Sequence, residues 1–174
     1  MKNAEFLDYM LEFPRFHIIG TNTDVGKTFV GCALTEFFLE HKLEFIALKP
    51  IESYDLESNS DTLKYIETYQ KFNITKTRED INLYHLEKAC SPHLSLRTSF
   101  FEIRIAQVLD FISKPYFGSI EWAGGLMTPI NYLHTQFDII KQFPLPILLV
   151  AHAGLGTLNH ILLTVNALKT TQNK

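Results

Sequence analysis

The sequence predicts an α/β fold with three layers, in which a mostly parallel β-sheet has helices on both faces. Short apolar runs alternate along the chain with segments whose apolar residues recur every three or four positions. Such runs are typical of strands that are buried on both faces, and their alternation with helices indicates repeated β-α-β units. The chain has 174 residues, of which 46% are hydrophobic, and this is enough for one core. We therefore predict a single domain over residues 1–174, with about residues 1–14 as an N-terminal extension.

Four apolar runs have the length and richness of buried strands. They are residues 15–20, 44–50, 117–121 and 145–151, and residues 82–86 are a candidate for another short strand. The first run is followed directly by a glycine-containing loop and then by a helical pattern. This order predicts a ligand site at the carboxyl edge of the sheet, where open α/β sheets bind their ligands.

Two segments between the strands have a regular helical stripe. The first follows Thr28 and ends near His41 and Lys42, where a helix C-terminus favours cations. Its apolar positions are Val30, Ala33, Leu34, Phe37 and Phe38. The second stripe consists of Leu158, Ile161, Leu162, Val165 and Leu168. Residues 61–70 and 100–113 are less regular helical candidates.

Composition and charge argue against several classes of protein. The net charge is -3 and no basic stretch indicates a nucleic-acid partner. No run of apolar residues is long enough to span a membrane, and the N-terminal residues lack the uninterrupted apolar region of a signal peptide. Cys32 and Cys90 lie far apart and have no metal-like spacing, which fits a reducing compartment. We expect a cytoplasmic protein that binds neither nucleic acid nor membrane.

The loop "GTNTDVGKT" nearly matches the phosphate-binding pattern G-x-x-x-x-G-K-[ST]. The strict pattern needs glycine at position 21, but the chain has Thr21 there and Gly20 before it. The chemistry survives this change, because backbone N–H groups hold the phosphates, Lys27 adds positive charge and the Thr28 hydroxyl can ligate Mg²⁺. An incidental glycine-rich turn is the ordinary alternative. The strand before the loop and the helix after it favour phosphate binding, and hence a P-loop NTPase-type fold.

Charged residues also stand at the ends of the other predicted strands. Lys49 closes one strand, Glu121 closes another ahead of Gly124 and Gly125, and Asp61 stands at a predicted helix start. Taken singly, each has an ordinary explanation as a solvated strand end, a loop residue or a helix cap. Together with the loop they predict one site for a Mg²⁺-nucleotide, with carboxylates on the metal and lysines on the migrating phosphoryl group.

A series of motifs carries a resemblance to a known family. In chain order they are "GTNTDVGKT", "LKPIES", "NSD", "CSPHLS", "IEWAGGLMTPI" and "LPILLVAHAGLGTLNHILLT". Over about residues 16–168 the chain resembles the dethiobiotin synthetases, the enzymes of biotin synthesis that close a ureido ring. The displaced loop glycine is the spacing that this family uses, and "GLGTLNHILLT" is a second, independent signature.

The resemblance implies an ATP- and Mg²⁺-dependent cyclo-ligase that makes dethiobiotin from 7,8-diaminononanoate and CO2. One substrate amine takes up CO2 as a carbamate, the carbamate attacks the γ-phosphoryl group, and the other amine displaces phosphate from the mixed anhydride. Fixed positive charge is needed because carbamate and triphosphate are both anions. The resemblance also implies a homodimer with the substrate site at the subunit interface.

The family's functional residues map onto matching positions. Lys27 and Lys49 would be catalytic. The Mg²⁺ ligands would be Thr28, Asp61 and Glu121. The nucleotide would contact Thr23, Asp24, Val25, Gly26, Lys27, Thr28, Phe29, Glu121, Gly124 and Gly125. Ser53 would contact the diamine, and the substrate carboxylate would be held by the second subunit through Gly156, Thr157, Leu158 and Asn159, where a helix begins.

The chain departs from the family pattern in two places. The family follows its strand-end glutamate with glycine, whereas this chain has Trp122. We expect an indole beside the γ-phosphate site to crowd the substrate or to reshape the loop, because glycine permits a close backbone approach that a side chain blocks. Family members also continue for several tens of residues beyond the "LLT" helix and read the adenine base there. We therefore expect the triphosphate to bind with weaker selectivity for the base.

These departures leave an alternative function open. The chain would then be a catalytically silent P-loop dimer that binds nucleotide or phosphate and has a regulatory or binding role. A third hypothesis, a partition-type ATPase, is disfavoured because that class has a lysine early in the loop. This chain has Thr21 and Asn22 at those positions.

Overall fold

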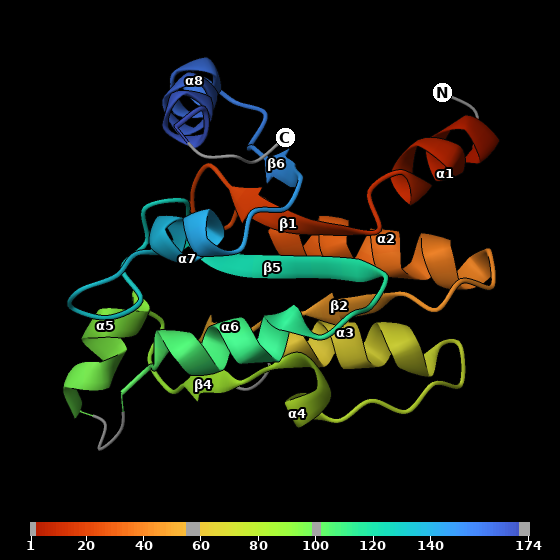
Figure 1. Cartoon of the computed structure of the whole chain (residues 1–174), viewed down its shortest axis with the longest axis horizontal. Coiled ribbons are helices and arrows are strands. Elements are labelled where there is room, and N and C mark those ends of the chain that lie inside the picture. Colours follow the sequence, from red (N-terminus) through yellow and green to blue (C-terminus); the bar gives the residue numbers. More distant parts are fainter. Residues whose placement is uncertain (1–2, 55–59, 99–101, 171–174) are drawn as a thin grey trace.

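The computed structural model describes residues 3–54, 60–98 and 102–170. Within these ranges the helices lie above and below a parallel sheet (Figure 1). The strands are β1 (Arg15–Gly20), β2 (Ile46–Leu48), β3 (Ile51–Ser53), β4 (Tyr84–Leu86), β5 (Gly118–Gly125) and β6 (Ile147–Val150). The helices are α1 (Asn3–Leu11), α2 (Lys27–Glu40), α3 (Asp61–Gln70), α4 (Arg78–Ile81), α5 (Pro92–Ser95), α6 (Ile105–Ser113), α7 (Gln136–Gln142) and α8 (Thr157–Leu168), with a 3-10 helix at Leu96–Thr98.

The main sheet has the strand order β2-β5-β1-β6, and all of its neighbouring strands are parallel. A second, two-stranded sheet pairs β3 with β4, also in parallel. The parallel order places the carboxyl ends of β1, β2 and β5 along one edge, which is where the P-loop follows β1. The predicted fold class, a three-layer α/β fold of the P-loop NTPase type, is confirmed.

The two faces of the sheet are covered by different helices. Phe16 and Ile18 of β1 pack with α1 and α2, whereas Ile19 points to the other face and packs with α6 and α7. This alternation follows from the two-residue period of a strand. Tyr65 and Tyr69 bring α3 against β2 on the same side as α2. The carboxyl edge of the sheet, where the P-loop lies, is therefore flanked by α2 and α3.

The predicted N-terminal extension contains α1, which is packed onto the domain. Met10 of α1 belongs to the same cluster as α2, and the Phe6 ring meets the Phe37 ring with centroids 5.3 Å apart. Burial of these aromatic rings stabilises the docking of α1. The boundary at residue 14 and the single-domain assignment stay predictions.

The predicted strands are all present, but of the four main runs only 15–20 keeps its predicted bounds, and the run 145–151 is shortened to β6. The run 44–50 is shortened to β2, because the Lys49 N–H donates to the carbonyl of Ile81 (2.8 Å) and Pro50 has no N–H to give to β5. The run 117–121 is lengthened to Gly125, which lies opposite Gly20 beyond an irregularity in register. The candidate strand 82–86 becomes β4.

The helical predictions for residues 61–70 and for the segment after Thr28 are confirmed by α3 and α2. His41 also lies where the C-terminus of α2 was expected, with its Nδ1 2.7 Å from the carbonyl oxygen of Phe37. The helix expected over 100–113 was too long, because α6 begins at Ile105 after an extended Arg104. Residues 100 and 101 of that prediction lie outside the described residues.

Several short elements were not predicted, namely α1, α4, α5, α7 and β3. Two of them are marked by caps rather than by periodicity: Thr135 and Asp138 form a capping box at the start of α7, and Thr77 and Asp80 do so at α4. None of the helices in the described ranges has the length and apolarity needed to cross a membrane.

Candidate functional site

The P-loop joins the end of β1 to the start of α2. A Cβ at Gly20 would lie 2.6 Å from the Asn22 carbonyl oxygen and 2.9 Å from the Lys27 Nζ, so only glycine fits where the loop folds back. Gly26, with φ 96°, adopts the left-handed region and precedes the first turn of α2 without a side-chain cap. The displaced first glycine therefore has a steric role, and the N–H groups at the start of α2 remain open to an anion.

Lys27 is a buried cation at the start of α2. Its side chain is 6% exposed, and its Nζ donates to the carbonyl oxygen of Asn22 at 3.1 Å. Burial lowers the pKa of Lys27, and the nearby positive charge of Lys49 lowers it further. Among the described residues, none of the ion pairs includes Lys27. An ammonium in this position is poised for an anionic ligand.

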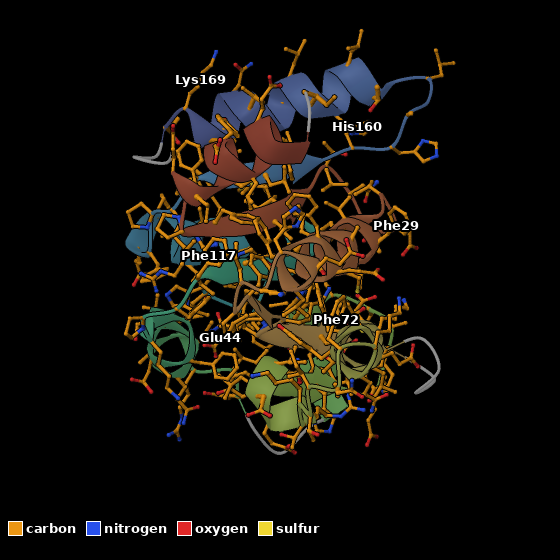
Figure 2. The ribbon with its side chains drawn as sticks, turned by 90° about the vertical axis from the view of Figure 1, so that its right-hand side faces the viewer. Phe29, Glu44, Phe72, Phe117, His160 and Lys169 are labelled. Atoms are coloured by element: carbon orange, nitrogen blue, oxygen red, sulfur yellow. The ribbon has the colours of Figure 1, made fainter. Side chains whose placement is uncertain are left out.

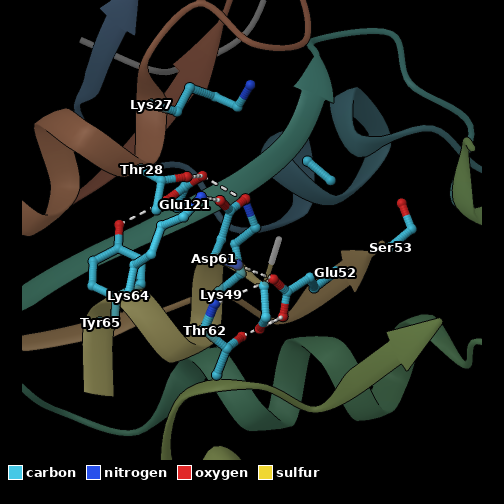
Figure 3. Close-up of polar contacts among 12 residues, drawn as sticks. Lys27, Thr28, Lys49, Glu52, Ser53, Asp61, Thr62, Lys64, Tyr65 and Glu121 are labelled. Atoms are coloured by element: carbon cyan, nitrogen blue, oxygen red, sulfur yellow. Dashed lines mark hydrogen bonds and ion pairs between the residues drawn. The ribbon is translucent and has the colours of Figure 1, made fainter. Parts of the chain in front are cut away.

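Lys49, from the segment after β2, is held between two carboxylates (Figure 3). Its Nζ lies 2.8 Å from Asp61 Oδ2 and 2.5 Å from Glu121 Oε1, and the lysine and Glu121 side chains are 2% and 0% exposed. Burial opposes the charge on Lys49, but the two carboxylates outweigh it and raise the pKa of Lys49. Burial likewise opposes ionisation of Asp61, but Lys49 lowers the pKa of Asp61 to about 2. Lys49 and Asp61 are therefore both charged at neutral pH.

The residues predicted to bind Mg²⁺ come together around this lysine. Thr28 Oγ1 donates to Glu121 Oε1 at 2.8 Å, and Asp61 lies on the other side of the ammonium. In the described part of the chain, no group of three or more His, Cys, Asp or Glu side chains forms a metal cluster. A hydroxyl and two carboxylates are nevertheless a donor set that suits Mg²⁺ when phosphate oxygens and water complete its shell. The cation already held by these carboxylates shows that they can neutralise positive charge at this point.

A cleft of about 800 Å³ opens beside these groups. Ten of the predicted residues line it: Thr23, Asp24, Gly26, Lys27, Thr28, Phe29, Lys49, Ser53, Asp61 and Gly124. Phe29 is 80% exposed on the first turn of α2 (Figure 2). Glu121 lies beneath the cleft in contact with Lys49, whereas Gly125 lines a second cavity of about 400 Å³ on the α8 side. The cleft joins the P-loop to the end of β3.

The remaining predicted residues do not line this cleft. Val25 is in the P-loop but is not part of the cleft lining. The residues predicted to hold a substrate carboxylate, Gly156, Thr157, Leu158 and Asn159, lie at the start of α8 and do not line it either. Within one protomer, the structure therefore does not bring these four residues to the phosphate site.

Comparison with known proteins decides the family. A family model described as an AAA domain matches residues 15–174. An ATP-dependent dethiobiotin synthetase of Francisella tularensis subsp. holarctica (strain LVS) is 36% identical over 163 residues, which is 88% of this chain and 73% of the relative. The chain belongs to the dethiobiotin synthetase family. Proteins of the same name from Lysinibacillus sphaericus (strain C3-41) and Lawsonia intracellularis (strain PHE/MN1-00) are 34% and 37% identical, and each match covers 90% of this chain and 70% of the relative.

Trp122 does not crowd the phosphate site of this dethiobiotin synthetase family member. The expectation was wrong because successive residues of a strand point to opposite faces, so that Glu121 faces the cleft and Trp122 faces the core. The indole is 1% exposed and packs with residues of α6 and α7. Its Nε1 donates to His17 Nδ1 at 3.1 Å. The departure from the family pattern is thus accommodated in the core.

His17 is locked as a neutral ring by this arrangement. Its Nδ1 accepts from Trp122, and its Nε2 lies 2.9 Å from the Phe143 carbonyl oxygen, to which it donates. Burial lowers the pKa of His17 from 6.5 to about 4, although the hydrogen bond to Phe143 partly opposes this. The folded state therefore resists protonation of a group that the unfolded chain protonates readily.

This histidine makes the stability of the fold sensitive to acid. Its contribution is present above pH 6.5 and is lost as the pH falls toward 4. From the shift, we expect about 3 kcal/mol of unfolding free energy to be lost over that window. The measurement is urea unfolding at pH 7 and pH 4 for the wild type and for His17→Gln, whose amide does not titrate. The variant should lose less stability on acidification, and equal losses in both proteins would refute the assignment.

Two buried side chains of the site were missed by the sequence analysis. Glu52 of β3 caps α3, since its carboxylate accepts from the backbone N–H groups of Asp61 and Thr62 and from the Ser60 and Thr62 hydroxyls. This fixes the first turn of α3 and so the place of Asp61. Tyr65, one turn further along, donates to Glu121 Oε2 at 2.7 Å. Neither has a sequence signal beyond a position near a predicted site residue.

Proposed function

We propose that this chain is an ATP- and Mg²⁺-dependent dethiobiotin synthetase of biotin biosynthesis, which closes the ureido ring from 7,8-diaminononanoate and CO2. The observation that carries the proposal is the pair of buried lysines on one cleft. Lys27 has only a backbone carbonyl as a hydrogen-bond partner among the described residues, and Lys49 bridges two carboxylates. Membership of the family supports the same activity.

The phosphates bind at the start of α2. The backbone N–H groups after Gly26 and the positive end of the helix face the β- and γ-phosphates, and Lys27 gives them a charge partner. The P-loop residues Thr23, Asp24 and Phe29 flank the nucleotide on one side of the cleft. Gly124 flanks it on the other, at the end of β5.

Mg²⁺ would be held by Thr28, Asp61 and Glu121. When bound, the metal neutralises charge on the β- and γ-phosphates and so favours transfer of the phosphoryl group. Asp61 and Glu121, which now pair with Lys49, would then also hold the metal, and Lys49 would be able to contact the migrating phosphoryl group. A preorganised lysine stabilises the transferred charge without reorganisation at the moment of reaction.

The reaction has three steps. One amine of the diamine adds to the carbon of CO2 and loses a proton, which gives a carbamate. A carbamate oxygen attacks the γ-phosphorus and ADP leaves. The second amine then attacks the carbonyl carbon of the mixed anhydride, phosphate departs and the ring closes with loss of a proton. Lys27 and Lys49 hold the two anions in contact, which converts their encounter into a reaction within one complex.

The diamine would extend from Ser53 toward a second copy of the chain. Ser53 Oγ lines the cleft and donates to the Cys90 carbonyl oxygen at 2.8 Å. In a homodimer, Gly156, Thr157, Leu158 and Asn159 of the second subunit would hold the substrate carboxylate at the start of α8. Support comes from the exposed apolar side chains of this region, namely Leu155, Leu158, Leu162 and Leu163, which are 111%, 73%, 61% and 62% exposed.

The test is a direct assay of dethiobiotin formation by the purified protein. Purified protein with 7,8-diaminononanoate, bicarbonate, Mg²⁺ and ATP should release dethiobiotin, ADP and phosphate in equal amounts, measured by mass spectrometry and a phosphate assay. Omission of any one component should stop product formation. Nucleotide binding with no dethiobiotin under saturating substrates would contradict the proposal and would favour the catalytically silent P-loop dimer.

A further inference from the structure

Tyr65 places a phenol hydroxyl against the buried carboxylate of the site. It stands four residues after Asp61, so both side chains lie on the same face of α3. The Tyr65 side chain is 0% exposed, and its hydroxyl donates to Glu121 Oε2 at 2.7 Å. Thr28 and Lys49 both contact the other oxygen, Oε1. The two carboxylate oxygens are thus divided between the cleft and α3.

The neighbouring helix α2 leaves a gap that lets the phenol reach this carboxylate. Gly31 of α2 lies beside Tyr65, and a Cβ on Gly31 would be 1.8 Å from the Tyr65 hydroxyl oxygen. Glycine in a helix interior costs about 1 kcal/mol relative to alanine. The fold tolerates this glycine at a position where a side chain would push the phenol away from Glu121.

We propose that Tyr65 is a positioning residue, which holds Oε2 of Glu121 so that Oε1 faces Thr28, Lys49 and the cation bound with the nucleotide. The inference deepens the proposed function and rests on it, because it assigns a role within the Mg²⁺-nucleotide site. Tyr65 itself contacts neither phosphate nor substrate in this arrangement.

The physical reason lies in what changes when a metal and a nucleotide bind. Thr28 and Lys49 then turn toward their new partners, and the contact from Tyr65 is the one that stays. The terminal torsion of a glutamate is broad, so a carboxylate without this contact can rotate away from the metal. Hydrogen bonds to ligating carboxylates fix their orientation, and loss of such a partner typically weakens metal affinity 10- to 100-fold.

The test measures metal affinity rather than turnover. Mn²⁺ is titrated into the protein saturated with a non-hydrolysable ATP analogue, and free Mn²⁺ is followed by electron paramagnetic resonance. Tyr65→Phe should bind Mn²⁺ roughly 10-fold more weakly than the wild type. The matched control is Tyr69→Phe, on the same helix. The Tyr69 hydroxyl accepts from the Ala47 N–H at 2.8 Å and donates to the Phe45 carbonyl oxygen at 2.9 Å, remote from Glu121. This control should keep the wild-type Mn²⁺ affinity even if it is less stable.

A second variant tests whether the effect passes through Glu121. In a Glu121→Gln background, Tyr65→Phe should cause little further loss of Mn²⁺ affinity, because the oriented carboxylate is already gone. Additive losses, or equal Mn²⁺ affinity for Tyr65→Phe and the wild type, would overturn the positioning role. Circular dichroism of each variant identifies any that fails to fold, and Gly31→Ala then supplies the same displacement of the phenol from α2.

The outcomes separate this inference from the proposed function. If the wild type binds the metal and nucleotide together and only the Tyr65→Phe result fails, the positioning role is wrong and the proposed function stands. If the wild type shows no metal-dependent binding of the nucleotide analogue, the proposed function is wrong and the inference falls with it.

Discussion

Replacing Lys49 by methionine should abolish most dethiobiotin formation and, in the same protein, raise the affinity for a divalent cation in the absence of nucleotide. The loss of turnover should be roughly 10²- to 10³-fold, because a preorganised charge partner of the transferred phosphoryl group is removed. The gain in metal affinity follows from the geometry. The Lys49 ammonium now lies within 2.8 Å and 2.5 Å of Asp61 and Glu121, and removing it leaves two carboxylates to be neutralised by the metal.

The same substitution should lower stability. Breaking a buried ion pair by removing one partner costs about 3 to 5 kcal/mol, because a buried charge is left without compensation. Mn²⁺ titration, turnover and urea unfolding check the three effects together. Lys71→Met is the control, since Lys71 pairs with Glu36 at 3.4 Å on the surface and is 57% exposed. A Lys49→Met protein with unchanged Mn²⁺ affinity would contradict the competition between ammonium and metal.

Replacing Lys27 by methionine should weaken nucleotide binding without the loss of stability expected for Lys49→Met. Nucleotide affinity should fall roughly 10- to 100-fold, because a charge-assisted contact to phosphate is lost. The free energy of unfolding should stay the same or rise, since the lysine is buried at 6% exposure with a carbonyl rather than a carboxylate as its hydrogen-bond partner. Methionine keeps the apolar stem and removes the desolvated charge.

Calorimetry with Mg-ATP and urea unfolding measure these two quantities. A clear loss of stability in Lys27→Met would show that the ammonium is compensated inside the fold and is not held ready for an anion. Comparison with Lys49→Met is the sharper test, because the two lysines line the same cleft but only Lys49 is paired with carboxylates among the described residues.

Much of the fold follows from local patterns in the sequence. The apolar runs identify the four strands of the main sheet, and the α3 prediction at residues 61–70 has the bounds that the structure shows. A short element such as α7 cannot be predicted from periodicity, because seven residues contain too few turns of the pattern. Its sequence signal is a capping box instead. The early end of β2 also depends on a contact with Ile81, which is distant in the sequence.

The site was predictable where strand ends carry charge and unpredictable where contacts cross between elements. Lys27, Lys49, Asp61 and Glu121 were identified by position, and the parallel sheet brings them to one edge. Tyr65 looks like a core aromatic residue in the sequence. Its contact with Glu121 depends on the packing of α3 against α2, which no local pattern encodes.

The direction in which a strand side chain points explains why the prediction for Trp122 was wrong. Trp122 follows Glu121 directly and was expected to crowd the phosphate site. The alternation of a strand turns it into the core, where His17 accepts its N–H. Its indole therefore contacts His17 in the core and does not enter the cleft.

The most direct test of the central claim is a crystal structure with Mg²⁺ and a non-hydrolysable ATP analogue. We expect the β- and γ-phosphates at the start of α2 within hydrogen-bond distance of Lys27 Nζ, the metal in contact with Thr28, Asp61 and Glu121, and Lys49 turned toward the γ-phosphate. Phosphates bound elsewhere, or Lys49 still bridging both carboxylates beside a bound nucleotide with no metal between them, would contradict the account.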